Sequence, residues 1–503
     1  MTDKFKDWKT LSFSGGLVTS IPSHLVPADS SPDTENYDPS EYGMLKGRPG
    51  AAYYTTSDLA VAQKVRGLVS ATNSAGTQNI LAKVNTALYD LTASQTWATT
   101  RTTNSALLAG DELHFVFFNN TFIFVCERGG PTGATTIAPE SAAVSSNFAA
   151  LGGTPTQGKY IVVHKNRVWV FNNATNSSKC AYCALGVSTD WSTANNAGTF
   201  DLNKEDGFVI NGAASDGDVL YVSKVAGSNS EVGAIYAIYG DGPGQFIPRK
   251  IADVPALNHR CFAATPFGVA VVTPIGVFLI SPRANSITND RGLFPIGTKI
   301  NKTLLDITSA QRYITACGVY RKQLWVSYCD SGSLNNKILV CDVPTGRWIR
   351  YRVASENISC FATGEDGVLY GGRASVSSDI RVLKFNTGSA PAPGGAYDCY
   401  WHTPNISFGE PWQDKKLHEL GLYAKNDNVS YTITQYVDNV AQGTTITINP
   451  STATPGGISQ RENVPGNNTV GRMHFLRVVY SNAGVQAELY GIMMQAMVYP
   501  PAR

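Results

Sequence analysis

The chain has 503 residues, of which 16% are charged, and its formal net charge at pH 7 is only +2. Its Lys and Arg residues are scattered, which argues against a basic stripe that would bind nucleic-acid phosphates. No apolar run approaches the roughly 20 residues of a membrane-spanning helix, so no membrane insertion is expected. Abundant Gly, Tyr and small polar residues favour many short strands, and the predicted class is all-β.

Residues 1–60 show no regular strand or helix pattern. Five prolines interrupt this stretch, and its first residues lead into no apolar signal segment. We predict that residues 1–60 are an N-terminal arm or platform segment that lies on another surface. The missing signal segment predicts synthesis in the cytoplasm.

Residues 61–386 repeat one unit, in which a short apolar strand, a tight turn and a second strand follow one another. The central turn residues of seven such units are Gly76, Asn120, Asn166, Gly217, Gly268, Lys322 and Gly367. Their spacings of about 44 to 54 residues suit four-stranded blades. Blades packed around an axis bury faces that one small sheet leaves exposed. We predict a β-propeller of six to seven blades, with stacked sandwiches or an open β-solenoid as the alternative.

The chain changes character after the repeats. Residues 387–398 are rich in Gly, Ala and Pro, and we predict that they form a linker. Residues 399–503 contain alternating strands such as 429–434 and 474–480, which predict a C-terminal β-sandwich that forms a platform.

No set of side chains in the sequence predicts catalysis. Cys180 and Cys183 have the spacing of half a zinc site, but no second close pair of ligands completes it. Asp111 and Glu112 are adjacent, and adjacent strand residues point to opposite faces, so we expect this pair to lie in a solvated turn. His114 lies inside a strand pattern, where a packed structural role is commoner. We therefore predict no catalytic, cofactor-binding or metal-binding residues.

Three segments of the chain share a likeness. Residues 13–50 contain GG, SPD, NYD and GMLKGRPG in that order, residues 166–170 precede Asp190-Trp191, and residues 406–412 read ISFGEPW. Together these segments resemble the β-propeller tail nozzle or tail hub proteins of short-tailed, podovirus-type bacteriophages. The likeness touches the whole chain, although the first two blades are divergent.

This resemblance implies a structural virion protein of the tail, made in the host bacterium. Such a protein forms a ring, expected to be a hexamer, below the portal and adaptor, and encloses the channel through which the DNA leaves. Tail fibres or tailspikes are further possible partners, and no enzyme activity or cofactor is implied. The expected assembly interface comprises Phe13, Gly15, Gly16, Phe408, Gly409 and Trp412. A structural role in turns is an equally good interpretation of the glycines.

The alternative is a propeller that binds or cleaves glycans. Trp169, Trp191, Trp325 and Trp348 could stack on sugar rings. However, Trp169 and Trp325 occupy equivalent positions in their units, and a repeated packing role predicts this equivalence.

Overall fold

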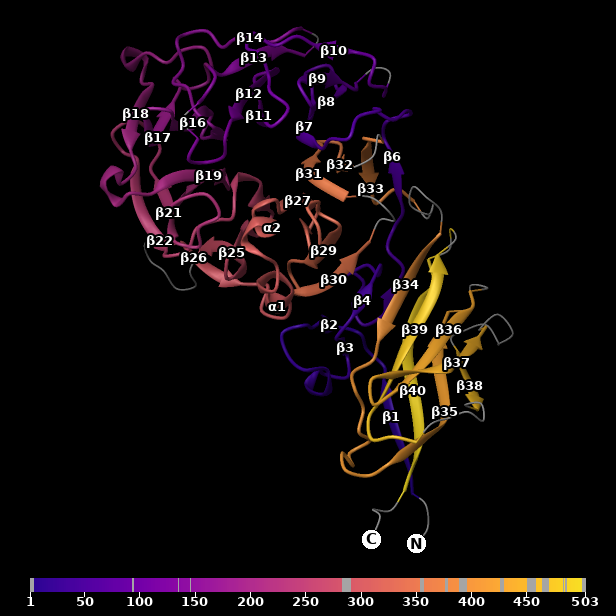
Figure 1. The fold of residues 1–503 in the computed structure, drawn as a ribbon. Coiled ribbons are helices and arrows are strands. Elements are labelled where there is room, and N and C mark those ends of the chain that lie inside the picture. The colour runs from indigo at the N-terminus through magenta and orange to yellow at the C-terminus, as the bar shows by residue number, and fades with distance from the viewer. Residues whose placement is uncertain are drawn as a thin grey trace.

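The computed structural model is an all-β protein in which a ring of four-stranded antiparallel sheets adjoins a two-sheet sandwich (Figure 1). The ring is a seven-bladed β-propeller, seen down its axis in Figure 1. The structure describes residues 4–92, 95–133, 135–144, 146–282, 291–352, 357–375, 379–388, 396–425, 429–449, 458–463, 470–482, 484 and 486–499.

In blades 1 to 6, four successive strands pair antiparallel as a meander, and in blade 7 three successive strands are joined by a strand from the N-terminal segment. Blades 1 to 4 comprise β7 (Val65–Thr72), β8 (Gln78–Val84), β9 (Ala87–Asp90) and β10 (Thr100–Arg101); β11 (Glu112–Phe118), β12 (Thr121–Glu127), β13 (Glu140–Ala143) and β14 (Ala149–Ala150); β15 (Tyr160–His164), β16 (Arg167–Asn173), β17 (Asn176–Tyr182) and β18 (Gly198–Asp201); and β19 (Val209–Ser215), β20 (Leu220–Val225), β21 (Gly233–Tyr239) and β22 (Ile247–Ala252). Blades 5 to 7 comprise β23 (Phe262–Thr265), β24 (Gly268–Thr273), β25 (Gly276–Pro282) and β26 (Arg291–Pro295); β27 (Ala316–Tyr320), β28 (Gln323–Tyr328), β29 (Lys337–Asp342) and β30 (Arg347–Tyr351); and β31 (Asn357–Thr363), β32 (Leu369–Ala374), β33 (Val382–Phe385) and β6 (Ala51–Tyr53). Between blades 5 and 6 lie two single-turn helices, α1 (Asn301–Leu305) and α2 (Ser309–Tyr313).

All seven predicted turns lie where the first strand of a blade meets the second. Asn119-Asn120 and Lys165-Asn166 are two-residue turns in which both residues have positive φ, between 46° and 59°. Two such residues in succession match the right-handed twist of the strands that they join, and Asn tolerates this conformation well. The repeat in the sequence is thus the first hairpin of each blade.

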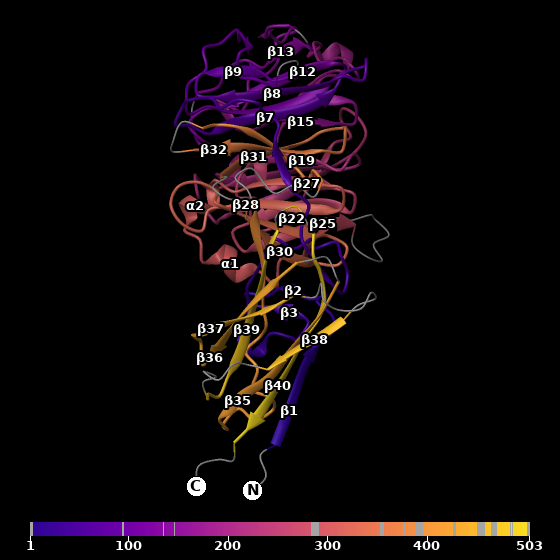
Figure 2. The ribbon, with the colours of Figure 1, turned by 90° about the vertical axis from the view of Figure 1, so that its right-hand side faces the viewer.

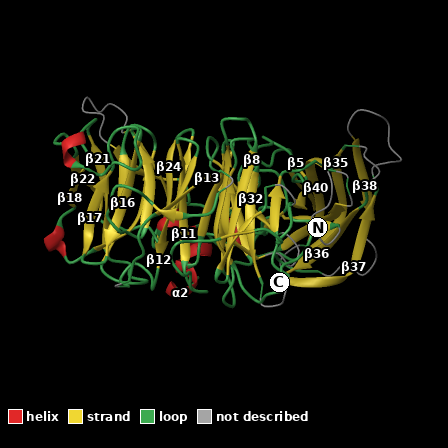
Figure 3. Cartoon of the chain, turned by 90° about the horizontal axis from the view of Figure 1, so that it is seen from above, coloured by secondary structure: helices red, strands yellow, loops and turns green. Residues whose placement is uncertain are grey.

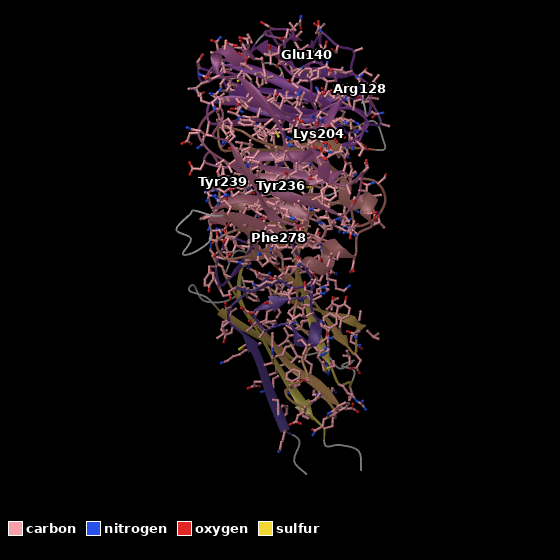
Figure 4. The ribbon with its side chains drawn as sticks, turned by 90° about the vertical axis from the view of Figure 1, so that its left-hand side faces the viewer. Arg128, Glu140, Lys204, Tyr236, Tyr239 and Phe278 are labelled. Carbon is pink, nitrogen blue, oxygen red and sulfur yellow. The ribbon has the colours of Figure 1, made fainter. Side chains whose placement is uncertain are left out.

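Neighbouring blades pack through apolar side chains. The interface of blades 3 and 4, for example, contains Trp169, Phe171 and Leu220, all fully buried. Figure 4 shows this side of the ring and labels Tyr236, Tyr239 and Phe278; Tyr239 of blade 4 and Phe278 of blade 5 pack at the next interface, between blades 4 and 5. Face-to-face packing of this kind buries both surfaces of each small sheet, which explains why the ring needs no long strands.

The ring is closed by a strand from the N-terminal segment. β6 pairs antiparallel with β33 and supplies the fourth strand of blade 7. The first three strands of this blade thus come from the end of the propeller sequence, and the fourth comes from a segment that precedes it. The structure therefore differs from the predicted division, because β6 lies within residues 1–60 yet completes a blade. Closure by a strand far along the chain fixes blade 7 beside blade 1.

The sandwich contains the strands from both ends of the chain. One sheet has β1 (Lys4–Thr10), β40 (Glu488–Val498), β35 (Lys415–Ala424) and β38 (Ile458–Asn463), with β5 (Leu45–Lys46) paired to β40. The other sheet has β4 (Thr34–Glu35), β34 (Tyr397–His402), β39 (His474–Asn482), β36 (Tyr431–Val437) and β37 (Val440–Ile448). The short strands β2 (Gly16–Leu17) and β3 (Ser30–Ser31) form a parallel pair. Both termini lie at the far end of the sandwich (Figure 2).

The propeller and the sandwich share one sheet. β4 pairs parallel with β30 of blade 6 and antiparallel with β34, which produces a nine-stranded sheet that runs from β27 to β37. Seen from above, the disc of blades and the sandwich lie side by side (Figure 3). Most of the predicted linker lies outside the described residues, and β34 already begins at Tyr397, within the range 387–398.

The N-terminal arm is anchored at this junction by Arg48. Its Nε donates to Asn36 Oδ1 at 2.9 Å, its guanidinium carbon lies 4.0 Å from the centre of the Tyr397 ring, and Tyr397 donates its hydroxyl proton to the Arg48 carbonyl at 2.6 Å. A planar guanidinium can donate in its plane and stack on its face at once. Arg48 thus ties the arm to the first strand of the C-terminal segment.

All nine cysteines are free thiols. Cys180 and Cys183 are fully buried, and burial raises the pKa of both thiols, so they pack as small apolar side chains in a core. Among the described residues, no helix combines the length and apolar character needed to cross a bilayer.

Candidate functional site at the propeller axis

The first strands of the blades surround the axis, and charged side chains at their starts meet across it. The carboxylate of Glu112, the first residue of β11, forms ion pairs with three cations: Arg66 Nη1 at 2.6 Å, Arg260 Nη1 at 2.9 Å and Lys64 Nζ at 3.2 Å. Lys64 and Arg66 come from blade 1, Glu112 from blade 2, and Arg260 from the turn that leads into blade 5. Ion pairs therefore join blades on opposite sides of the ring.

A second carboxylate, Glu127, lies directly opposite Glu112 in the pairing of β11 with β12. Its Oε2 accepts from His114 Nε2 at 3.1 Å, and its Oε1 accepts from the hydroxyls of Tyr160 at 3.0 Å and Tyr313 at 3.1 Å. Tyr313 ends α2, so this contact also spans the axis. Every donor to Glu127 is itself held in a strand or helix, which fixes the carboxylate in place.

Electrostatics keep both carboxylates ionised. Burial would raise the pKa of Glu112, but the charges of Arg260, Lys64 and Arg66 outweigh it and lower that pKa to about 2. Burial also opposes ionisation of Glu127, and the hydrogen bond and charge of His114 reverse this and lower its pKa. His259 packs edge-on against His114 at 4.4 Å, and burial followed by the charge of His114 places its pKa well below the ordinary value.

The cluster borders a cavity of about 220 Å³ at the mouth of the axis. Charged and phenolic side chains line it, namely Lys64, Arg66, Glu112, Glu127, Arg260 and Tyr313. This volume lies below the roughly 300 to 1,000 Å³ of pockets that hold drug-sized ligands. The cavity therefore suits a small ion or a few water molecules.

The two carboxylates do not form a hydrolytic pair of the glycosidase kind. Such a pair needs one carboxyl group with a raised pKa to act as general acid, whereas the pKa values of Glu112 and Glu127 are both lowered. Within the described part of the chain, no group of three or more His, Cys, Asp or Glu side chains is arranged to hold a metal ion. The arrangement can bind and hold charge.

Sequence reasoning misjudged this pair of positions. Asp111 and Glu112 were expected in a solvated turn, yet Asp111 is 1% exposed and ion-pairs with Arg128 at 2.6 Å, and Glu112 is the centre of the axial cluster. A signal was present, because Arg66, Glu112 and Arg260 all stand within a few residues of where a first strand begins. His114 has the packed role predicted for it.

Two of the predicted interface residues are buried within the chain. Phe13 is fully buried and packs edge-on against Trp401 at 5.1 Å. Phe408 is 7% exposed and belongs to the same apolar core. In the single chain, the apolar surfaces of both side chains are already covered, and whether they also contribute to a contact between subunits stays a prediction.

The predicted interface glycines occupy turns and close approaches. A Cβ at Gly15 would lie 1.8 Å from Ser30 Oγ, and at Gly16, where φ is +70°, it would lie 2.7 Å from the Trp348 carbonyl oxygen. Gly409 also has a positive φ, of 77°. These glycines thus fit the alternative interpretation as structural positions. Trp412 alone of the six predicted residues has a largely exposed side chain, at 82%.

The tryptophans of the glycan alternative are mostly core residues. Trp169, Trp325 and Trp348 are at most 1% exposed. Trp191 is partly exposed and donates its indole proton to the Ser188 carbonyl at 2.8 Å. A stacking platform for sugars needs an open ring face, and three of these four rings have none.

No protein-family model matches the chain, and no curated protein matches it. Similar solved structures include the Phanerochaete chrysosporium exo-β-1,3-galactanase with galactose, at 10% identity, with 87% of this chain and 99% of that chain covered and a TM-score of 0.26. The WD40 domain of Neurospora crassa Pan2 has 8% identity, coverage of 68% and 96%, and a TM-score of 0.35. The β-propeller domain of the Pyrococcus furiosus Trilobed protease has 8% identity, coverage of 64% and 96%, and a TM-score of 0.36. At such scores the likeness carries no argument about function, and the strand pairing defines this chain as an all-β protein with a multi-blade β-propeller.

Proposed function

We propose that this protein is a structural, non-enzymatic subunit of a short-tailed bacteriophage tail. It forms a homo-oligomeric ring, expected to be a hexamer, below the portal and adaptor, and the ring encloses the channel for DNA ejection. Tail fibres or tailspikes are candidate partners at its other end. The proposal rests on the resemblance of three sequence segments and on a fold suited to a rigid part of an assembly.

The observation that carries the proposal is the continuity of the propeller with the sandwich. The nine-stranded sheet crosses from one to the other, and a single apolar core contains Trp325 and Ile349 of blade 6, Phe385 of blade 7, and Trp401 and Leu476 of the sandwich. Domains joined by small polar interfaces move relative to one another, whereas a shared sheet and core prevent such movement. Such a rigid connection suits a subunit that must keep its shape within a larger assembly.

The axis of a single propeller is unsuited to carry DNA. Arg260 and Glu112 pair across it from blades 5 and 2, and Tyr313 reaches Glu127 in the same way. A duplex would have to break these contacts in every molecule. The DNA channel of the proposed assembly therefore lies between copies of the chain, as a ring of subunits provides.

A candidate contact between subunits lies on the sandwich. Trp412 is 82% exposed, and the ion pair of Glu410 with Lys6, at 2.9 Å, holds its loop beside β1. Phe5 of β1 is also half exposed. Exposed Trp and Phe side chains are typical of surfaces that become buried on association.

The test is the mass of the purified protein by light scattering, with negative-stain images of the same sample. We expect rings with near-sixfold symmetry, either alone or after addition of portal and adaptor proteins. A chain that stays monomeric and forms no ring on a portal and adaptor complex would refute the proposal. Hydrolysis of a glycan by the pure protein would favour the alternative function.

A further inference from the structure

The axial cavity has an excess of positive charge. Among the residues that line it, Lys64, Arg66 and Arg260 are cations and Glu112 and Glu127 are carboxylates, so three positive charges face two negative ones. A fourth cation, the fully buried Lys159, donates from its Nζ to the carbonyl of Gly130, a lining residue, at 2.6 Å. Lys159 thus adds a positive charge beside the lining residues.

One donor beside this cavity has no partner, although the carboxylates of the cavity are satisfied. Glu127 accepts three hydrogen bonds and Glu112 three ion pairs, as described above. Arg66 Nε is buried and has no hydrogen-bond partner. A buried donor without a partner costs free energy unless a water molecule or ion satisfies it. The group that still lacks a hydrogen-bond partner at this site is thus part of a cation, Arg66.

We propose that the axial cavity binds a small oxyanion of the phosphate class, held by Lys64, Arg66 and Arg260. Oxyanions accept several charge-assisted hydrogen bonds at once, and Arg donors suit them in geometry. The cavity of about 220 Å³ accommodates an ion of this size and is smaller than the pockets that hold drug-sized ligands. The bound ion would connect cations of blades 1 and 5 at the point where Glu112 of blade 2 already joins them.

The consequence is a propeller whose stability depends on the oxyanion. A ligand that binds only the folded chain stabilises it in proportion to the logarithm of its concentration. The cations that hold the ion come from ring positions far apart in the sequence, so opening of the ring would release it. This inference is independent of the proposed function, because it concerns the propeller of one chain.

The test is calorimetric titration of the full chain with inorganic phosphate, against potassium chloride at the same ionic strength, together with the Tm in each solution. We expect saturable binding of one phosphate per chain and a rise in Tm. Lys64→Gln should weaken the binding about tenfold, because one charge-assisted hydrogen bond is lost. Arg66→Lys keeps the charge, removes Nε and should also weaken the binding.

Lys302→Gln is the matched control, because Lys302 makes the same charge change on the exposed helix α1 and lies outside the cavity. Its phosphate affinity should equal that of the wild type. Absence of phosphate binding to a wild-type chain that melts cooperatively would overturn the proposal. Equal weakening by Lys64→Gln and Lys302→Gln would also overturn it, since that result indicates general screening of surface charge.

Discussion

The centre of the propeller and the interior of the sandwich are both places where β-sheets meet, and their chemistry is opposite. At the propeller axis, Glu112 and Glu127 collect cations and hydroxyl groups from several blades. Between the sheets of the sandwich, Phe13, Trp401 and Leu476 form part of one apolar core. This difference in chemistry follows from the number of sheets that meet at each place: two in the sandwich and seven at the propeller axis.

Two facing sheets present flat surfaces, and apolar side chains interdigitate between them over the whole area. Seven first strands instead converge on a line, where few side chains fit and where the mouth is open to water. Ion pairs at such a place connect particular blades, because each charge needs its own partner. The ion pairs at the axis therefore specify which blades face one another. The sandwich core instead supplies much of the apolar burial where the propeller meets the sandwich.

The largest effect is expected from Phe13→Ala in the sandwich. Removal of a fully buried Phe should lower the free energy of unfolding by about 3 to 5 kcal/mol, measured by denaturant titration. The contact with Trp401 adds a coupling of about 1 kcal/mol in a double-mutant cycle with Trp401→Ala. Unchanged stability of the monomer together with loss of the ring would show instead that Phe13 is an interface residue.

At the propeller axis, Glu112→Gln should destabilise the chain by about 2 to 3 kcal/mol. The change leaves Lys64, Arg66 and Arg260 close together without their common carboxylate, and the effect is moderated because Glu112 is 14% exposed. Denaturant titration of the propeller transition measures it. Glu365→Gln, in an exposed turn of blade 7, is the control and should change stability by less than about 0.5 kcal/mol. An effect of Glu112→Gln no larger than this control would contradict an organising role for the axis.

Acid should reduce the difference between wild type and Glu112→Gln. The pKa of Glu112 in the folded chain is about 2, below the ordinary 4.5, so its carboxylate contributes stability that is complete above pH 4.5 and is lost as the pH falls towards 2. The two chains should therefore converge in stability across this range, as measured by Tm at successive pH values. A difference that stays constant down to pH 2 would mean that the carboxylate charge is unimportant.

The smallest effect on folding is expected from Trp412→Ala. Because this side chain is 82% exposed, its removal should change the free energy of unfolding by less than about 0.5 kcal/mol. If Trp412 lies in the subunit contact, the same variant should shift the light-scattering mass towards the monomer. A ring of unchanged mass and salt stability would exclude Trp412 from the contact and leave Phe5 as the next candidate.

The sequence predicted the local features of the propeller well. Each of the seven turns is a short-range signal, since Gly and Asn residues such as Asn120 and Gly217 permit the positive φ that the first hairpin of a blade requires. Composition predicted the all-β class, and the regular spacing of these turns predicted the propeller. Trp169 and Trp325 fulfilled their expected packing role for the same reason, because equivalent positions in repeated units have equivalent surroundings.

Contacts between distant segments were decided by the tertiary structure alone. Nothing local in residues 51–53 indicates that they complete blade 7, because a fourth strand is recognised by the edge that it covers. Likewise, in the sequence Glu112 is only one of two adjacent carboxylates. The closed ring brings it to Arg260, which is 148 residues away in the chain. The sequence by itself determined the repeating hairpins through backbone preferences that act over a few residues. Packing between segments far apart in the chain determined the rest. Closure of the ring produced the charged axis, and assembly of the sandwich buried Phe13.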